Sequence, residues 1–225
     1  VIPNALRFGA QVVCDLRAAK ILHDGKRVRG VLAYVVRSDG SDGADLTFSA
    51  RAVCVSASAV LSPALLLHSD VPDPHKLAGR SLRLHPGVAV GGCFSDLVEA
   101  WKGIPQAYEC TEKLSFSDGA QDRCWLIPAF AHPGGFAGLQ PGFGKQHAAA
   151  VRAYAKTAVV AAMLHDDTKG IVSIDRKGRA KVDYALTDSD AKSLLRGVRA
   201  AAEILLAAGA QEVMIPLARP LLIRR

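Results

Sequence analysis

The sequence predicts a mixed α/β (α+β) fold, and three features of the chain support this. Residues 11–50 contain short apolar runs separated by glycine turns, which is typical of antiparallel strands. Residues 52–55 are a continuous apolar run followed by small residues and a Ser-Pro pair, as in a buried strand that leads into a helix. Residues 188–208 repeat apolar side chains at helical spacing. A chain of 225 residues has room for one large domain or two small ones.

The N-terminal part is expected to be a short helix followed by antiparallel strands. Residues 2–8 are typical of a helix end, which Gly9 stops. A hairpin turn is predicted at His23–Lys26, where Gly25 suits a positive φ. The strands are expected at residues 11–16, 20–22, 28–36 and 45–50.

The segment after these strands is predicted to form a further strand, a turn and a capped helix. Residues 52–55 are apolar throughout, as in a central strand that is covered on both faces. We expect a helix over 64–69, with Ser62 as N-cap and Pro63 at its first position. Because a helix N-terminus favours negative charge, this edge is a candidate anion or cofactor site.

The second half predicts more strands and one long helix. Residues 132–135 and 141–144 are expected to be loops, and 157–164 fits either a strand or a helix. Thr187 is expected to cap the last helix and Gly209 to end it. The other elements are strands at 88–94 and 124–130, a helix at 145–156 and a hairpin of 171–174 with 181–184. The predicted buried face of the last helix is Ala191, Leu194, Leu195, Val198, Ala202 and Leu205.

Composition and charge exclude several classes of protein. The net charge is +7, but Lys and Arg are dispersed and aromatics are only 6%, which argues against a nucleic-acid partner. The longest apolar run, residues 52–67, contains serines and a proline and is too short for a transmembrane segment. No signal peptide is expected at the start. The five cysteines form no CxxC pair, so we expect no metal site and reduced thiols in a cytoplasmic protein.

The segment Val53–Ser69 resembles the second signature of the glucose–methanol–choline (GMC) flavoprotein oxidoreductases. That signature is an apolar strand followed by Ala-Ala-Gly-Ala-x-x-Ser-Pro and aliphatic residues. Leu82–Pro86 is similar to an Asn-Leu-x-x-His-Pro segment, especially in the long-chain alcohol oxidase-like branch. The Pro141–Gly144 loop, the hairpin at 170–184 and the end of the last helix also fit that branch.

The resemblance implies an FAD-dependent oxidoreductase that oxidises alcohols, apolar ones by preference, through hydride transfer to the flavin. It implies a partial FAD/NAD(P)-binding Rossmann-like domain at 1–87. An antiparallel-sheet substrate-binding domain would occupy 88–225 and include the helix 188–208. The expected partners are therefore FAD and a small-molecule alcohol.

The same resemblance implies which residues meet the cofactor. Ala18 matches the position whose backbone lies against the adenine, and the small-residue turn with Ala57 and Ser58 would approach the FAD. Ser62 begins the following helix. His85 either lies near the flavin or is a loop histidine that is bonded to backbone, and both readings stay open. Ser58 stands where the family commonly has Gly.

Two family motifs have no match in this sequence. The G-x-G-x-x-G turn that cradles the pyrophosphate is absent, and so is the segment with the catalytic base. We therefore expect no catalytic residue here, and a fragment that is inactive alone. The alternative is a non-catalytic remnant or partner-binding module of the same fold. An uncovered apolar face would then cause oligomerisation or association with the missing part of the chain.

Overall fold

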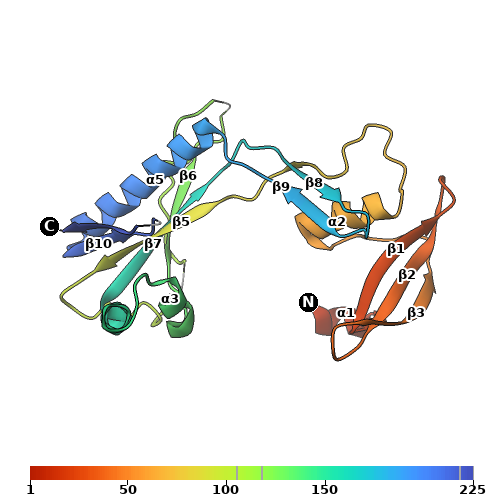
Figure 1. The fold of residues 1–225 in the computed structure, drawn as a ribbon, viewed down its shortest axis with the longest axis horizontal. Coiled ribbons are helices and arrows are strands. Elements are labelled where there is room, and N and C mark those ends of the chain that lie inside the picture. The colour runs from red at the N-terminus through yellow and green to blue at the C-terminus, as the bar shows by residue number, and fades with distance from the viewer. Residues whose placement is uncertain (105, 118, 218, 225) are drawn as a thin grey trace. The chain divides into compact units, whose positions relative to one another are not determined.

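The computed structural model describes residues 1–104, 106–117, 119–217 and 219–224. Two compact units make up the chain (Figure 1). Unit 1 contains Val1–Leu82 and Lys169–Tyr184, and unit 2 contains Arg83–Thr168 and Ala185–Arg225. The mixed α/β class is confirmed, with helices and antiparallel sheets.

The hairpin near residues 170–184 lies in unit 1, whereas the expected boundary at 87 placed it in the second domain. The reason is strand pairing, because β4 (Arg80–Leu82) pairs with β8 (Gly170–Ile174) in antiparallel register. The assignment of 1–87 to FAD binding and 88–225 to substrate binding stays a prediction.

Unit 1 contains two three-stranded sheets, as far as its described residues go. In one, β1, β2 and β3 follow chain order, and in the other β8 lies between β4 and β9. Helix α2 (Ser58–His68) contacts strands of both sheets. The remaining elements are α1 (Ile2–Arg7), β1 (Leu16–His23), β2 (Val28–Val36), β3 (Asp42–Ser49) and β9 (Ala180–Asp183).

The hairpin between β1 and β2 is confirmed, but the strand predicted at 11–16 is wrong over most of its length. Residues 11–15 are exposed and carry no strand. Asp15 has φ +54, which breaks the extended backbone just before β1 begins at Leu16. The predicted strand at 20–22 is the second half of β1.

The strand predicted at 52–55 is also wrong within the described part of the chain. These residues form no strand; Val53 and Val55 are half-buried and Cys54 is exposed. An apolar run makes a central strand only when neighbouring strands pair with it and cover it. In the described residues every recorded strand pair is antiparallel and none includes this run.

Helix α2 begins at Ser58, six residues earlier than the predicted start at 64. Pro63 therefore lies inside the helix, where it lacks the N–H that other residues donate four residues back. Ser62 does not cap the helix. Its Oγ accepts a hydrogen bond of 2.9 Å from the Ala57 N–H, and this contact ties the turn to the first helical turns.

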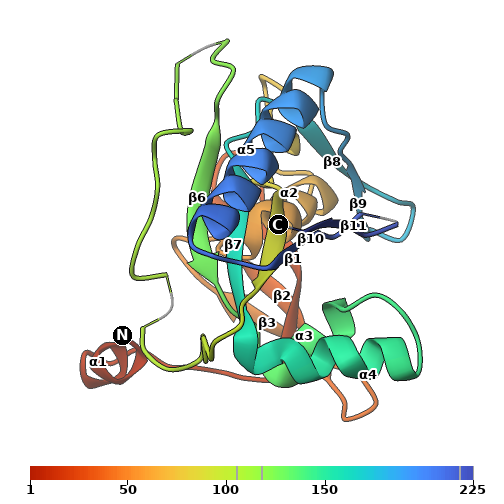
Figure 2. The same cartoon turned by 90° about the vertical axis from the view of Figure 1, so that its left-hand side faces the viewer.

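Unit 2 is built on a five-stranded antiparallel sheet with the order β11-β10-β5-β7-β6. Helix α5 (Asp188–Ala207) runs along this sheet and contacts β5, β6, β7 and β10 (Figure 2). The strands are β5 (Gly87–Cys93), β6 (Cys124–Ala129), β7 (Thr157–Leu164), β10 (Glu212–Ile215) and β11 (Leu221–Arg224). The other helices are α3 (Pro133–Leu139), α4 (Lys145–Arg152) and a 3₁₀ turn, Ala153–Lys156.

Most predicted elements of unit 2 are confirmed. The ambiguous segment 157–164 is a strand, since its register with β5 and β6 places it inside the sheet. The loop predicted at 132–135 is wrong: His132 accepts a hydrogen bond from the Gly134 N–H and caps α3. β10 and β11, of four residues each, were not predicted.

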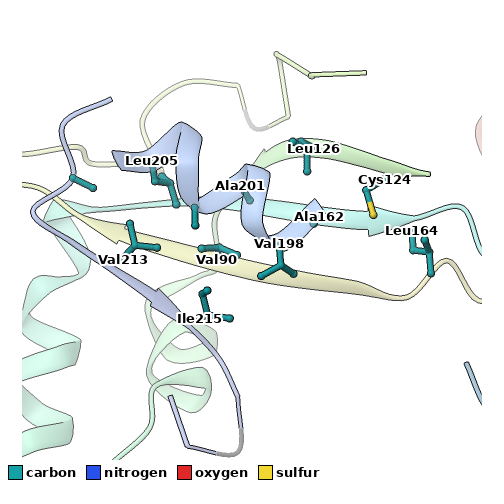
Figure 3. Packing of buried hydrophobic residues seen from close by; sticks show 12 residues of the cluster. Val90, Cys124, Leu126, Ala162, Leu164, Val198, Ala201, Leu205, Val213 and Ile215 are labelled. Carbon is teal, nitrogen blue, oxygen red and sulfur yellow. The ribbon is translucent and has the colours of Figure 1, made fainter. Parts of the chain in front are cut away.

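The core of unit 2 lies between α5 and the sheet (Figure 3). Thr187 caps the helix as predicted, and its side chain accepts from the Asp190 N–H. Gly209 has φ +100 and ends it, also as predicted. The buried cluster consists of Val90, Cys124, Leu126, Ala162, Leu164, Val198, Ala201, Ala202, Leu205, Ala210, Val213 and Ile215.

The buried face of α5 differs from the predicted one at Leu195, which is 64% exposed. The helix instead buries small residues, Gly197 and Ala201, against the sheet. A Cβ on Gly197 would come within 2.6 Å of both Cβ and Sγ of Cys124. Small residues therefore let the helix backbone approach β6 closely. None of the helices in the described ranges is long and apolar enough to cross a bilayer.

We expect Gly197→Ala to lower the free energy of unfolding by about 1–3 kcal/mol, because the new methyl group overpacks the contact with Cys124. This loss outweighs the helix-propensity gain of about 1 kcal/mol. Urea unfolding measures the change. Gly138→Ala in α3 is the matched control, since its Cβ meets nothing within 4 Å and should stabilise. Equal stabilisation by both changes would contradict the close approach.

Candidate functional site

Three of the predicted cofactor-binding residues, Ala57, Ser58 and Ser62, lie together at the start of α2. Ala57 is the N-cap and donates its N–H to Ser62 Oγ. Ser58 Oγ lies 3.4 Å from the backbone nitrogens of Val60 and Leu61, which are long contacts. The turn is therefore held by short polar side chains, and no bulky group stands in it.

Ser58 has φ +75, a left-handed conformation that costs an L-residue about 1–2 kcal/mol. This is the position where the related flavoprotein signature commonly has Gly, which adopts this conformation without strain. Ser58 is exposed and Ala57 is half-buried. The backbone of this turn is thus accessible to a ligand, and the first N–H groups of α2 make it favourable for negative charge.

Ala18 is exposed on β1, next to an irregularity in its pairing with β2. Two hydrogen bonds join β1 to Ser69, at the opposite end of α2 from Ser58. Ile21 N donates to Ser69 Oγ at 2.8 Å, and His23 Nε2 lies 2.8 Å from the Ser69 carbonyl oxygen. The strand that carries Ala18 is therefore fixed to the helix that carries the turn.

His85 belongs to unit 2, and its backbone is held by Asp166. The carboxylate of Asp166 accepts from Leu84 N at 3.2 Å and from His85 N at 3.1 Å. His85 has φ +40, so this grip keeps it in a conformation that is rare for a residue with a side chain. Its side chain is exposed, and no hydrogen bond to its ring is recorded among the described residues.

Unit 2 also contains a buried ion pair that was not predicted from the sequence. Arg123 Nη2 lies 2.8 Å from Asp190 Oδ1, and the two side chains are 1% and 0% exposed. Asp190 also accepts from Asp167 N at 3.0 Å and from Thr168 N at 2.9 Å. Thr168 Oγ1 donates to the same carboxylate at 2.6 Å. Asp190 is therefore a buried acceptor of several hydrogen bonds.

Burial alone would raise the pKa of Asp190, but hydrogen bonds from Asp167, Thr168 and Thr187 outweigh it. The pKa of Asp190 is thereby lowered from 3.8 to about 2. The carboxylate is therefore ionised at neutral pH and compensates the buried guanidinium of Arg123.

A series of contacts through intermediate residues connects α5 to the backbone of His85. Asp190 holds the backbone of Asp167 and Thr168. The Asp167 side chain forms ion pairs with Arg123 and, at 3.6 Å, with Arg83. Asp166 then holds the His85 N–H. We name Arg83, Arg123, Asp166, Asp167, Thr168 and Asp190 the Arg123–Asp190 network, in which Arg83 and Asp167 are exposed and the other four residues are buried.

The side chains of the described residues offer no arrangement of three or more His, Cys, Asp or Glu that could hold a metal ion. The sequence contains little indication of the Arg123–Asp190 network. Arg123 stands in an ordinary surface pattern, and Asp residues near a helix start are usually caps. Only the fold brings residues 123, 167 and 190 together.

Comparison with known proteins identifies relatives. Residues 1–87 match the family model described as GMC oxidoreductase. An uncharacterized GMC-type oxidoreductase of Mycobacterium tuberculosis is 33% identical over 98% of this chain and 33% of its own length. A long-chain-alcohol oxidase of Arabidopsis thaliana is 28% identical over 93% of this chain and 29% of its own. The chain thus spans about a third of the length of these relatives.

Ser58→Gly is expected to raise the free energy of unfolding by about 0.5–1 kcal/mol, because it removes the left-handed strain. Ser58→Ala keeps the strain and loses the Oγ contacts, so it should destabilise. Urea unfolding of both variants gives the difference, which we expect to be about 1 kcal/mol or more. Equal stability of the two variants would argue against a strained turn.

Asp190 is expected to make stability fall in acid. Its pKa is depressed in the folded state, so its contribution is complete above its unfolded pKa of 3.8 and is lost as the pH falls through about 2. That contribution is about 2 kcal/mol. Unfolding measured between pH 5 and pH 2 should show this loss.

Asp190→Asn should remove this acid-dependent part and cost about 3 kcal/mol at pH 7, because Arg123 loses its buried counter-charge and keeps only the exposed carboxylate of Asp167. Asp188→Asn is the control, since Asp188 is an exposed residue of the same helical turn. An Asp190→Asn variant with the parent pH profile would rule out this role.

Proposed function

We propose that this chain belongs to the GMC oxidoreductase family and is part of an FAD-dependent oxidoreductase that acts on the CH–OH group of alcohols. The observation that carries the proposal is the 33% identity to a GMC-type oxidoreductase over 98% of the chain. The similarity covers both units and is not limited to residues 1–87. Because the chain spans a third of that relative, the activity is proposed for a larger protein.

We propose an apolar alcohol as the substrate. Long-chain-alcohol oxidases of Arabidopsis thaliana are 28% and 29% identical over 93% and 90% of this chain. An oxygen-dependent choline dehydrogenase of Xanthomonas is 33% identical but over only 62% of the chain. The broader coverage by the alcohol oxidases supports the apolar substrate over a charged one.

The start of α2 fits one part of a bound FAD. Ala57 and Ser58 form an exposed turn of small residues, and the backbone N–H groups that follow suit a negatively charged group. Ser62 supports the turn by accepting from Ala57 N. Ala18 would offer its backbone on β1. The sequence has no G-x-G-x-x-G turn, so these residues supply one contact region of the cofactor site.

When bound, FAD supplies the electron chemistry and accepts a hydride. His85 is proposed as a cofactor-binding residue from the resemblance alone, and its side chain is exposed. Asp166 accepts a hydrogen bond from the His85 N–H and so holds its backbone. The neighbouring Asp167 N–H is held in turn by Asp190.

No residue of this chain matches the family's catalytic base, so we propose that the chain alone does not oxidise alcohols. A non-catalytic partner-binding module is the second candidate, and the unpaired apolar run at 52–55 favours it. We also propose a cytoplasmic location, because the odd number of cysteines and their spacing do not form a disulfide framework typical of secreted proteins.

We expect the purified chain to bind FAD, measured as protein-perturbed flavin absorbance that survives desalting. Ala57→Phe should lower the retained flavin at least tenfold, because the ring fills the turn where backbone must approach the ligand. Ala208→Phe, at the exposed end of α5, is the matched control and should retain the parent level. Circular dichroism checks that both variants fold.

Colourless parent protein would contradict FAD binding by this chain and favour the partner-binding alternative. Equal retention in the Ala57→Phe variant would mean that the turn is not the contact region. The same preparations are incubated with a primary alcohol and an electron acceptor. Turnover by the parent chain would overturn the proposal that it is inactive alone.

A further inference from the structure

We propose that unit 1 contains a second binding site, for an organic phosphate, in a hollow lined by arginines. The hollow has a volume of about 780 Å³, and we name it the arginine hollow. Neither the similarity to GMC oxidoreductases nor the turn at Ala57 assigns a role to it. The residues that line it are Arg27, Val28, Arg29, Ser49, Ala50 and Arg51.

The arginine hollow lies where β2 begins and β3 ends. The two strands are antiparallel, with Gly30 opposite Ser49, so residues 27–29 and 49–51 meet at one end of the sheet. Ala50 N donates to the Arg29 carbonyl at 3.0 Å and extends the pairing beyond the strands. Both sides of the hollow are therefore anchored to the same paired backbone.

Gly30 keeps these two segments close together. It has φ +156, and a Cβ at this position would lie 1.9 Å from the Phe48 carbonyl oxygen. No residue with a side chain fits there. This tight approach places the arginines of both segments around one space.

Within the part of the chain that the structure describes, only one of the three arginines forms an ion pair. Arg29 Nη2 pairs with Asp24 Oδ2 at 2.5 Å. Among the described residues, Arg27 and Arg51 form no ion pair. Two exposed guanidinium groups in one hollow repel each other, and an anion between them relieves that repulsion.

Asp24 is the acidic group that limits the charge of the hollow. It accepts from Lys26 N at 2.9 Å and from Arg27 N at 2.8 Å. These backbone bonds, with the contact from Arg29, lower the pKa of Asp24 to about 2. It is therefore ionised at neutral pH and neutralises Arg29, which leaves Arg27 and Arg51 to bind a ligand.

Phosphate is the chemistry that suits this pair. A guanidinium donates two parallel N–H bonds to phosphate oxygens, and a diphosphate offers enough oxygens for two such groups. The hollow is open to solvent and has room for a group larger than one phosphate. Val28 and Ala50 add apolar wall for the organic part of the ligand. A nucleoside diphosphate has this combination.

The test is calorimetric titration of the 225-residue chain with ADP, pyrophosphate and adenosine. We expect ADP to bind most tightly, pyrophosphate more weakly and adenosine not measurably. Arg27→Gln and Arg51→Gln should each weaken ADP binding at least tenfold. Arg176→Gln, an exposed arginine in the β8–β9 turn of the same unit, should leave it unchanged.

Asp24→Asn provides a change in the opposite direction. The amide oxygen still accepts from the Lys26 and Arg27 backbone, while the negative charge that neutralises Arg29 is removed. ADP should then bind at least threefold more tightly. A gain of affinity cannot arise from misfolding, so this variant separates charge from structure.

Three results would overturn the site: no ADP binding by the parent chain, equal loss in Arg176→Gln and Arg27→Gln, or adenosine binding as tightly as ADP. FAD also carries a diphosphate, so Ala57→Phe is included. ADP affinity that Ala57→Phe leaves unchanged supports a separate site, and a parallel loss would assign the ADP signal to the turn. If FAD does not bind at the Ala57 turn, the arginine variants still test whether ADP binds in the arginine hollow.

Discussion

The buried ion pair between Arg123 and Asp190 is the constraint on which unit 2 depends. Two opposite charges that are 1% and 0% exposed are tolerated only when each is compensated. Asp190 meets this demand by accepting from Asp167 and Thr168 as well as from Arg123. The start of α5, the start of β6 and the segment after β7 are thereby held in one arrangement.

This arrangement reaches the surface at His85. Asp166 sits next to the residues that Asp190 anchors, and its carboxylate holds the backbone of Leu84 and His85. Asp190 lies on α5, and the small residues Gly197 and Ala201 let this helix pack closely against the sheet. The buried ion pair is thus linked, through residues 166–168, to the backbone of an exposed histidine.

Unit 1 is organised around backbone geometry and charge. Its turn at Ala57–Ser58 is strained, exposed and lined by small side chains, whereas its arginine hollow has two guanidinium groups that form no ion pair within the described ranges. Among the described residues, no partner offsets the strain of the turn or the charge of these two arginines. The apolar run at 52–55 is similar, because no strand of the described residues covers it. These features are those expected of surfaces that bind a ligand or further protein.

Local patterns in the sequence determined the helix that Thr187 caps and Gly209 ends and the hairpin at Gly25, because each depends on neighbours within a few residues. Tertiary structure decided the rest. Residues 52–55 have the composition of a central strand, but composition does not supply the neighbouring strands that a strand needs. Leu195 has helical spacing with the core, yet Gly197 faces the sheet because the helix approaches Cys124 too closely for a larger side chain. The pairing of Arg123 with Asp190 joins residues 67 positions apart, and only the folded sheet brings them within 2.8 Å.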